Sequence, residues 1–131
     1  MDTQDYIKPT DLQVGGTHYK AMTIQPIQLV RDIRLSFIEG NVLKYVTRFK
    51  YKNGKQDLEK AIHYMALAAD GYNVGIRTTE LSEERQELLA FYCVENAMDD
   101  ELFDILLEFL NFKHVHAKQM LTDYMNSLYK D

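Results

Sequence analysis

The stretch EGNVLKYVTRFKYKNGKQDLEK, residues 39–60, shows most plainly which kind of fold the chain adopts. Its large apolar residues recur at spacings of four and three, as on the buried face of an α-helix: Val42, Val46 and Phe49. The KNGK that follows stops this helix, because Gly54 after an asparagine is typical of a tight connection. We therefore predict helices over residues 41–51 and 56–72, joined by a short turn.

The sequence on both sides of this hairpin is helical as well. Pro26 suits the first position of a helix, where its missing N–H is not needed. A short apolar face continues from there to Leu35, before SFIEG interrupts it. After the loop GYNVGIRTT, the chain has three more helical segments, TELSEERQELLAFYCVENAM, DDELFDILLEFLNF and HAKQMLTDYMNSLY. Ser82 is a suitable N-cap for the first of them.

These patterns predict an all-α fold, a compact helical domain of about five to six helices with an irregular N-terminal arm. Within this single domain we distinguish the arm over residues 1–17, a basic helical core over residues 18–72 and an acidic helical half over residues 80–131. With 46% hydrophobic and 27% charged residues, the composition is that of an ordinary soluble globular protein.

Cysteine content and hydropathy predict the compartment. Cys93 is the only cysteine, so no disulfide forms within one chain, which agrees with a reducing, cytoplasmic setting. The polar, acidic start MDTQDYIKPTDLQVGG is unlike a signal peptide. No apolar run approaches the roughly 20 residues that a membrane span needs. We expect a cytoplasmic protein with no membrane contact.

The net charge of −5 conceals a strong division between the two halves of the chain. Residues 18–64 contain nine Lys or Arg against four Asp or Glu, a net charge of +5. Residues 80–131 contain four against twelve, a net charge of −8. Such asymmetry favours an anionic ligand for the first half. The alternative is that the two halves attract each other, within one chain or between subunits.

Four polar residues share one face of the predicted helix over residues 41–51, at spacings of i, i+3, i+4 and i+7: Asn41, Lys44, Tyr45 and Arg48. Lys52 continues the four-residue interval of the two cations. Amide, ammonium, phenol and guanidinium groups together suit a phosphorylated ligand. We also expect the backbone N–H groups of the helix start, near Gly40, to reach the same anion.

An ordinary solvated helix face explains the same pattern without any ligand. Like charges four residues apart cost only a few tenths of a kcal/mol. In addition, Asp57 and Glu59 stand just beyond the turn and are able to neutralise the cations of the preceding helix.

The segments THYKAMTIQPIQLV and EGNVLKYVTRFKYKNGKQDLEKAIHYM resemble a phage family labelled domain of unknown function 3310, also called SaV-like. Its pattern is a His-Tyr pair, then Gly-Asn-x-x-Lys-Tyr-x-x-Arg, then Asp-Leu-x-Lys-Ala and a Tyr. Those positions are here His18, Tyr19, Gly40, Asn41, Lys44, Tyr45, Arg48, Asp57, Leu58, Lys60, Ala61 and Tyr64. The resemblance covers about residues 16–70. The same domain ends a larger nucleotide kinase of short-tailed coliphages, so the resemblance implies a phage protein with a nucleotide as the anion.

The candidate ligand-binding residues are therefore His18, Tyr19, Asn41, Lys44, Tyr45, Arg48 and Lys52. His18 and Tyr19 follow two glycines, on a loop that either covers a ligand or fixes the N-terminal arm to the helices. We predict no catalytic residue, no metal site and no cofactor. His114 and His116 point to different sides of a helix, and the chain has no Gly-x-x-x-x-Gly-Lys-Ser/Thr loop.

Our hypothesis is a small phage protein in the host cytoplasm that binds a nucleotide, a cyclic nucleotide or another nucleotide-derived signal and sequesters it from host defence. The limited surface of a 131-residue chain favours a homo-oligomer. We expect no stable binding to duplex nucleic acid. One alternative is a nucleoside monophosphate kinase, and a further alternative is an inhibitor that binds a host protein through its acidic half.

Overall fold

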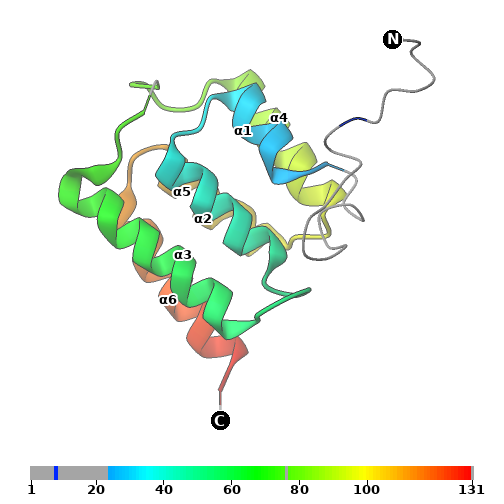
Figure 1. The fold of residues 1–131 in the computed structure, drawn as a ribbon, viewed down its shortest axis with the longest axis vertical. Helices are drawn as coiled ribbons and strands as arrows, with labels where there is room; N and C mark the ends of the chain where they lie inside the picture. Colours follow the sequence, from blue (N-terminus) through cyan, green and yellow to red (C-terminus); the bar gives the residue numbers. More distant parts are fainter. Residues whose placement is uncertain (1–7, 9–23, 76, 131) are drawn as a thin grey trace.

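The computed structural model describes residue 8 and residues 24–75 and 77–130, and within these ranges the fold is all-α (Figure 1). The elements are α1 (Pro26–Ile33), α2 (Phe37–Arg48), α3 (Lys55–Leu67), the π-helical turn η3 (Ala68–Tyr72), α4 (Glu83–Glu95), α5 (Asp100–Leu110) and α6 (His114–Leu128). The six helices confirm the predicted fold class. Apart from residue 8, the N-terminal arm falls outside the described residues. No described helix has the length and apolar character to cross a membrane.

The six helices form two layers of three. The chain passes through α1, α2 and α3 in one layer and then through α4, α5 and α6 in the other, and each helix of the first layer contacts its counterpart in the second (Figure 1). The first layer corresponds to the basic half of the sequence and the second to the acidic half. The two charged halves therefore form two different faces of the molecule.

The core lies between the two layers. The predicted stripe of α2 is buried, as are Leu58 and Met65 of α3, Leu89 of α4 and Leu106 of α5. One hydrogen bond also joins the layers within the core, since the hydroxyl groups of Thr47 and Tyr92 lie 2.7 Å apart. Cys93 is a core residue, and burial raises the pKa of its thiol to about 12.

Helix α2 begins four residues earlier than the sequence predicted. Ser36 Oγ accepts a hydrogen bond from the Glu39 N–H at 3.0 Å, and Glu39 Oε1 accepts one from the Ser36 N–H at 2.9 Å. This reciprocal arrangement is a capping box, so SFIEG starts a helix instead of interrupting one. The Gly40 N–H donates to the Ser36 carbonyl inside the helix. The helix start that we expected near Gly40 therefore lies at Phe37, and the Gly40 N–H is not available to an anion.

The carboxylate of Glu39 has a second, structural partner in the loop between the layers. Its Oε2 accepts a hydrogen bond from Arg77 Nη2 at 2.6 Å, and the two side chains are only 3% and 2% exposed. Arg77 Nη1 donates to the carbonyls of Thr79 and Leu110 at 2.9 and 2.8 Å. The loop is thus fastened to the start of α2 and the end of α5. The sequence predicted this loop but not its buried arginine.

His114 lies beside this buried pair and is expected to give the fold a pH dependence. Partial burial lowers the pKa of His114, an effect that the negative charge of Glu39 partly opposes. The unfolded chain binds a proton at His114 more readily than the folded protein does. The free energy of unfolding is therefore highest above the ordinary histidine pKa and decreases as the pH falls below it. We expect the urea midpoint to fall between pH 7.5 and 5.5, and to fall less in His114→Gln. An equal fall in both proteins excludes His114 as the cause.

Candidate functional site

Three cations surround one tyrosine on the outer face of the basic layer. The ammonium of Lys44 lies 4.4 Å from the centroid of the Tyr45 ring, the guanidinium carbon of Arg48 lies 4.7 Å from it, and the ammonium of Lys60 lies 5.4 Å from it. The ring of Tyr64 stacks on Tyr45 with centroids 6.1 Å apart and an interplanar angle of 18°. Residues of α2 and α3 therefore form one cluster in which positive charge gathers on aromatic rings.

Arg48 differs from the two lysines because its charge is matched inside the protein. Its Nε and Nη2 donate to the two carboxylate oxygens of Asp57, both at 3.2 Å. Arg48 is 9% exposed and Asp57 is fully buried. The neutralisation that the sequence left open as an alternative thus occurs at Arg48. This ion pair holds the end of α2 against the start of α3, and it places the guanidinium on the Tyr45 ring.

Lys44 and Lys60, in contrast, make no ion pair with any described residue. More generally, each ion pair among the described residues stays within one half of the chain or joins the connecting loop to α2. Within the described part of the chain, ion pairing between the halves therefore does not consume the positive charge of the basic layer.

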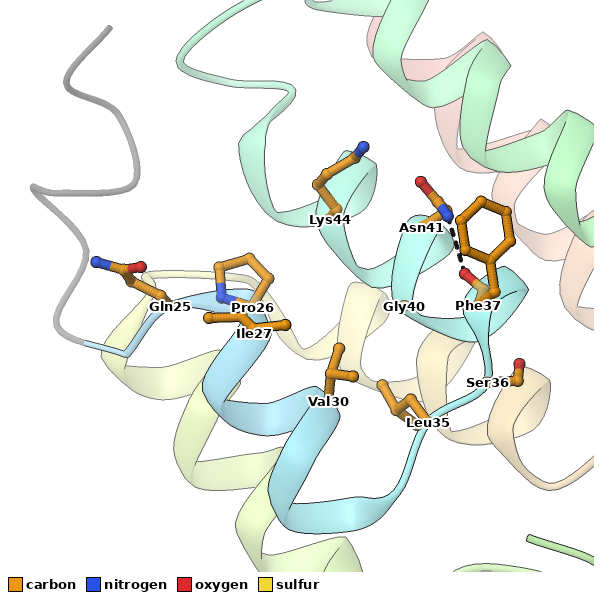
Figure 2. A pocket seen from close by; sticks show the side chains of 10 residues that line it. All are labelled: Gln25, Pro26, Ile27, Val30, Leu35, Ser36, Phe37, Gly40, Asn41 and Lys44. Carbon is orange, nitrogen blue, oxygen red and sulfur yellow. Dashed lines mark hydrogen bonds between the residues drawn. The ribbon is translucent and has the colours of Figure 1, made fainter. Parts of the chain in front are cut away.

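A groove of about 360 Å³ separates α1 from α2 and reaches Lys44 at one end (Figure 2). Its walls are formed by Gln25, Pro26, Ile27, Val30, Leu35, Ser36, Phe37, Gly40, Asn41 and Lys44. Gly40 lets the two helices approach closely, because a Cβ there would lie 3.3 Å from Val30 Cγ2. The walls are mainly apolar, and two large side chains on them face solvent: Ile27 is 61% exposed and Phe37 is 75% exposed.

Helix α2 contributes two polar side chains to this groove, Asn41 and Lys44, in addition to Gln25 and Ser36, which lie just before α1 and α2. Asn41 Nδ2 donates to the Phe37 carbonyl at 2.9 Å, which leaves the side-chain oxygen of Asn41 able to accept a hydrogen bond (Figure 2). The Lys44 side chain extends from the next turn of the same helix (Figure 2). Along its α2 edge the groove thus combines an apolar floor with the amide oxygen of Asn41 and the ammonium of Lys44.

A second cleft, of about 520 Å³, lies between α2 and α3. It is lined by Tyr45, Gln56, Glu59, Lys60, His63 and Tyr64. His63 is exposed, and its ring contacts Tyr64 at a centroid distance of 6.1 Å. Sequence reasoning did not place the α3 residues of this cleft in the site. Lys60 and Tyr64, one helical turn apart on α3, were nevertheless part of the family pattern.

The structure brings Asn41, Lys44, Tyr45 and Arg48 together on α2, as predicted. Lys52 does not join them, because α2 ends at Arg48 and not at Tyr51. Lys52 instead lines a different cleft with Gly54, Asp99 and Tyr129, among others. His18 and Tyr19 lie outside the described residues. Among the described residues, no group of three or more His, Cys, Asp or Glu side chains is arranged to hold a metal ion.

Residues 14–66 match the model of a family described as a protein of unknown function, DUF3310, which confirms the resemblance seen in the sequence. The matched segment includes α1, α2 and α3 as far as Ala66. Every residue that lines the groove or the second cleft falls within it. No curated protein and no solved structure matches the chain.

Proposed function

We propose that this chain, which carries a DUF3310 domain over residues 14–66, binds a nucleotide or nucleotide-derived signal in the groove between α1 and α2. The observation that supports the proposal most directly is an exposed apolar groove that ends at an ammonium group without an acidic partner among the described residues. A nucleotide has the matching composition, a flat ring beside a phosphate.

The groove suits a nucleobase in size and character. Ligand pockets in proteins are mostly apolar and have volumes of about 300–1,000 Å³. Burying apolar surface yields about 25 cal/mol per Å², and Ile27 and Phe37 expose much of their side chains at this groove. The side-chain oxygen of Asn41 makes no hydrogen bond to a described residue, and it is placed to accept one from an amino group of the base or a hydroxyl of the ribose.

The phosphate is assigned to Lys44. Charge-assisted hydrogen bonds between ammonium and phosphate are stronger than neutral ones and contribute about 1.5–3 kcal/mol. Arg48 supports this contact indirectly. Its guanidinium, paired with Asp57, packs on the Tyr45 ring and helps to hold it in place, and the ammonium of Lys44 lies over the same ring. Tyr45 orients the ammonium of Lys44, and its side chain also lines the second cleft.

Replacement of Lys44 by alanine is expected to weaken nucleotide binding about 10- to 100-fold, the equivalent of the lost charge-assisted contact. Isothermal titration calorimetry with the common ribo- and deoxynucleoside mono- and triphosphates measures the change. Lys130→Ala is the matched control, because Lys130 is an exposed lysine that follows α6 and lines neither the groove nor the second cleft. Equal affinity of Lys44→Ala and the unaltered protein would refute the phosphate assignment.

We further propose that the bound signal is withheld from host defence and not converted. Incubation with ATP, Mg²⁺ and each deoxynucleoside monophosphate tests this directly. Unchanged monophosphate supports sequestration. Diphosphate product that disappears in Lys44→Ala would instead establish the alternative, a nucleoside monophosphate kinase that uses the same site.

We also propose that the protein works as a homo-oligomer that contacts its copies through α4. This helix exposes three large apolar side chains, Leu88, Phe91 and Val94, on its outer surface. Native mass spectrometry of protein purified from a nucleotide-rich lysate reports the subunit number and any retained ligand in one measurement. A monomeric mass at micromolar concentration would contradict this part of the proposal.

A further inference from the structure

We infer that the complete ligand carries two bases joined through phosphate, with one base in the groove between α1 and α2 and the other in the cleft between α2 and α3. This inference rests on the proposed nucleotide-binding function and extends it to a ligand class, the dinucleotides.

The two depressions are neighbours that share one wall. Phe37 lines the groove and Tyr64 lines the cleft, and their rings meet edge to face with centroids 6.3 Å apart. Lys44 likewise lines the groove and Tyr45 the cleft, and the ammonium lies 4.4 Å from the ring centroid. At each of these two contacts, only a single pair of touching side chains separates the groove from the cleft. A ligand longer than one nucleotide can therefore reach from the groove over these side chains into the cleft.

The wall carries the positive charge that a phosphate linkage requires. Lys44 and Lys60 approach the same Tyr45 ring from α2 and α3, and neither forms an ion pair with a described residue. Two like charges on one ring repel each other in the free protein. A phosphodiester or pyrophosphate between two bases places negative charge at this point and relieves the repulsion.

The cleft has the groups that a second base needs. The rings of Tyr64 and His63 offer surfaces for stacking, which tolerates any base. Gln56 and Glu59 stand at the same cleft on α3, where a carboxylate accepts hydrogen bonds from amino and hydroxyl groups but repels phosphate. This distribution keeps the phosphate at Lys60 and Lys44, and directs the uncharged end of the ligand toward Glu59.

The test compares each nucleoside monophosphate with the linear 5′-phosphorylated dinucleotide of the same base, and with the corresponding cyclic dinucleotides, by isothermal titration calorimetry. Filling both depressions with one molecule makes the second contact intramolecular. We expect at least one dinucleotide to bind 10-fold or more tightly than its monophosphate, with one ligand per protomer.

The variants separate the two depressions. We expect His63→Ala to reduce dinucleotide affinity to the level of the monophosphate and to leave monophosphate affinity unchanged. We expect Lys60→Ala to weaken dinucleotide binding by a larger factor than monophosphate binding. Lys55→Ala is the matched control, because Lys55 is exposed on the same helix and does not line either depression. Circular dichroism melting curves show whether each variant is folded.

The outcomes distinguish failure of the two-base inference from failure of the proposed nucleotide binding on which it rests. Lys44-dependent monophosphate binding with no gain for any dinucleotide would overturn the two-base inference and leave the proposed function intact. Dinucleotide binding that Lys60→Ala and His63→Ala do not weaken would also overturn it, because the second base would then lie elsewhere. Absence of binding by either class of probe would overturn both.

Discussion

Arg77→Met lowers the free energy of unfolding by about 3–5 kcal/mol, enough to remove much of the stability of a small domain. In the unaltered protein, Arg77 Nη2 lies 2.6 Å from Glu39 Oε2. The substitution removes this guanidinium and leaves the buried carboxylate of Glu39 without a cationic partner. It also removes the donor to the carbonyls of Thr79 and Leu110. An uncompensated charge in a buried site costs more than a lost hydrogen bond, and this cost dominates the result.

Urea unfolding followed by circular dichroism measures the change, with Arg31→Met as the control. Arg31 also forms an ion pair, with Asp32 at 2.8 Å, but its side chain is 74% exposed, so no measurable loss is expected there. The double variant Glu39→Met/Arg77→Met should recover part of the loss, since neither charge is left alone. The recovery is incomplete because Glu39 also accepts the Ser36 N–H. A loss in Arg77→Met no larger than in Arg31→Met would contradict the assignment.

Asp57→Asn is expected to have the second large effect, a loss of about 3–5 kcal/mol, because it deprives a buried guanidinium of its carboxylate. Asp57 is fully buried and accepts hydrogen bonds from Arg48 Nε and Nη2 and from the Asn53 N–H. The asparagine preserves the shape of the side chain, but it removes the charge and replaces one acceptor oxygen by an NH2 donor. The loss therefore reports the ion pair and not a cavity.

Thermal unfolding by calorimetry measures this second effect, with Glu59→Gln as the matched control on the same helix. Glu59 is exposed and forms no ion pair with a described residue, so its neutralisation should leave the melting temperature unchanged. If Asp57→Asn unfolds at the temperature of the control, the ion pair contributes nothing and Arg48 becomes a candidate for direct phosphate contact. Ligand affinity of the variant, measured well below its melting temperature, separates the two roles.

Local sequence patterns were sufficient to predict the class of fold. The apolar spacing in residues 39–60 predicted the buried face of α2, and Ser82 caps α4 as expected, since its Oγ accepts from the Arg85 N–H at 3.2 Å. These features depend on residues within one helical turn of each other, so they can be read from the sequence directly.

The boundaries of α2 were harder to predict for a physical reason. Ser36 and Glu39 have the spacing of a capping box, but the glycine that follows suggested a break instead. Only the packed structure shows that Gly40 is there to let α1 approach. A glycine that serves helix packing and one that ends a helix look the same in a sequence.

The candidate site was predicted only along a single helix. The shared face of Asn41, Lys44 and Tyr45 followed from the helical repeat, but both depressions depend on how α2 packs against its two neighbours. Ile27 lay within the short apolar face predicted after Pro26, and Phe37 lay in the SFIEG segment that was expected to interrupt it. The partner of Glu39 lies 38 residues away in the loop. Contacts between elements are set by tertiary packing, which no local period encodes.

The arrangement of basic and acidic helices in opposite layers gives the molecule a permanent electric dipole moment, although its net charge is modest. In the field of an approaching polyanion, a dipole of this kind turns the protein so that the surface of α1, α2 and α3 faces the polyanion before any contact forms. The torque weakens as salt is added. The same polarity should allow the protein to adsorb to both cation and anion exchangers near neutral pH, with opposite sides facing the resin.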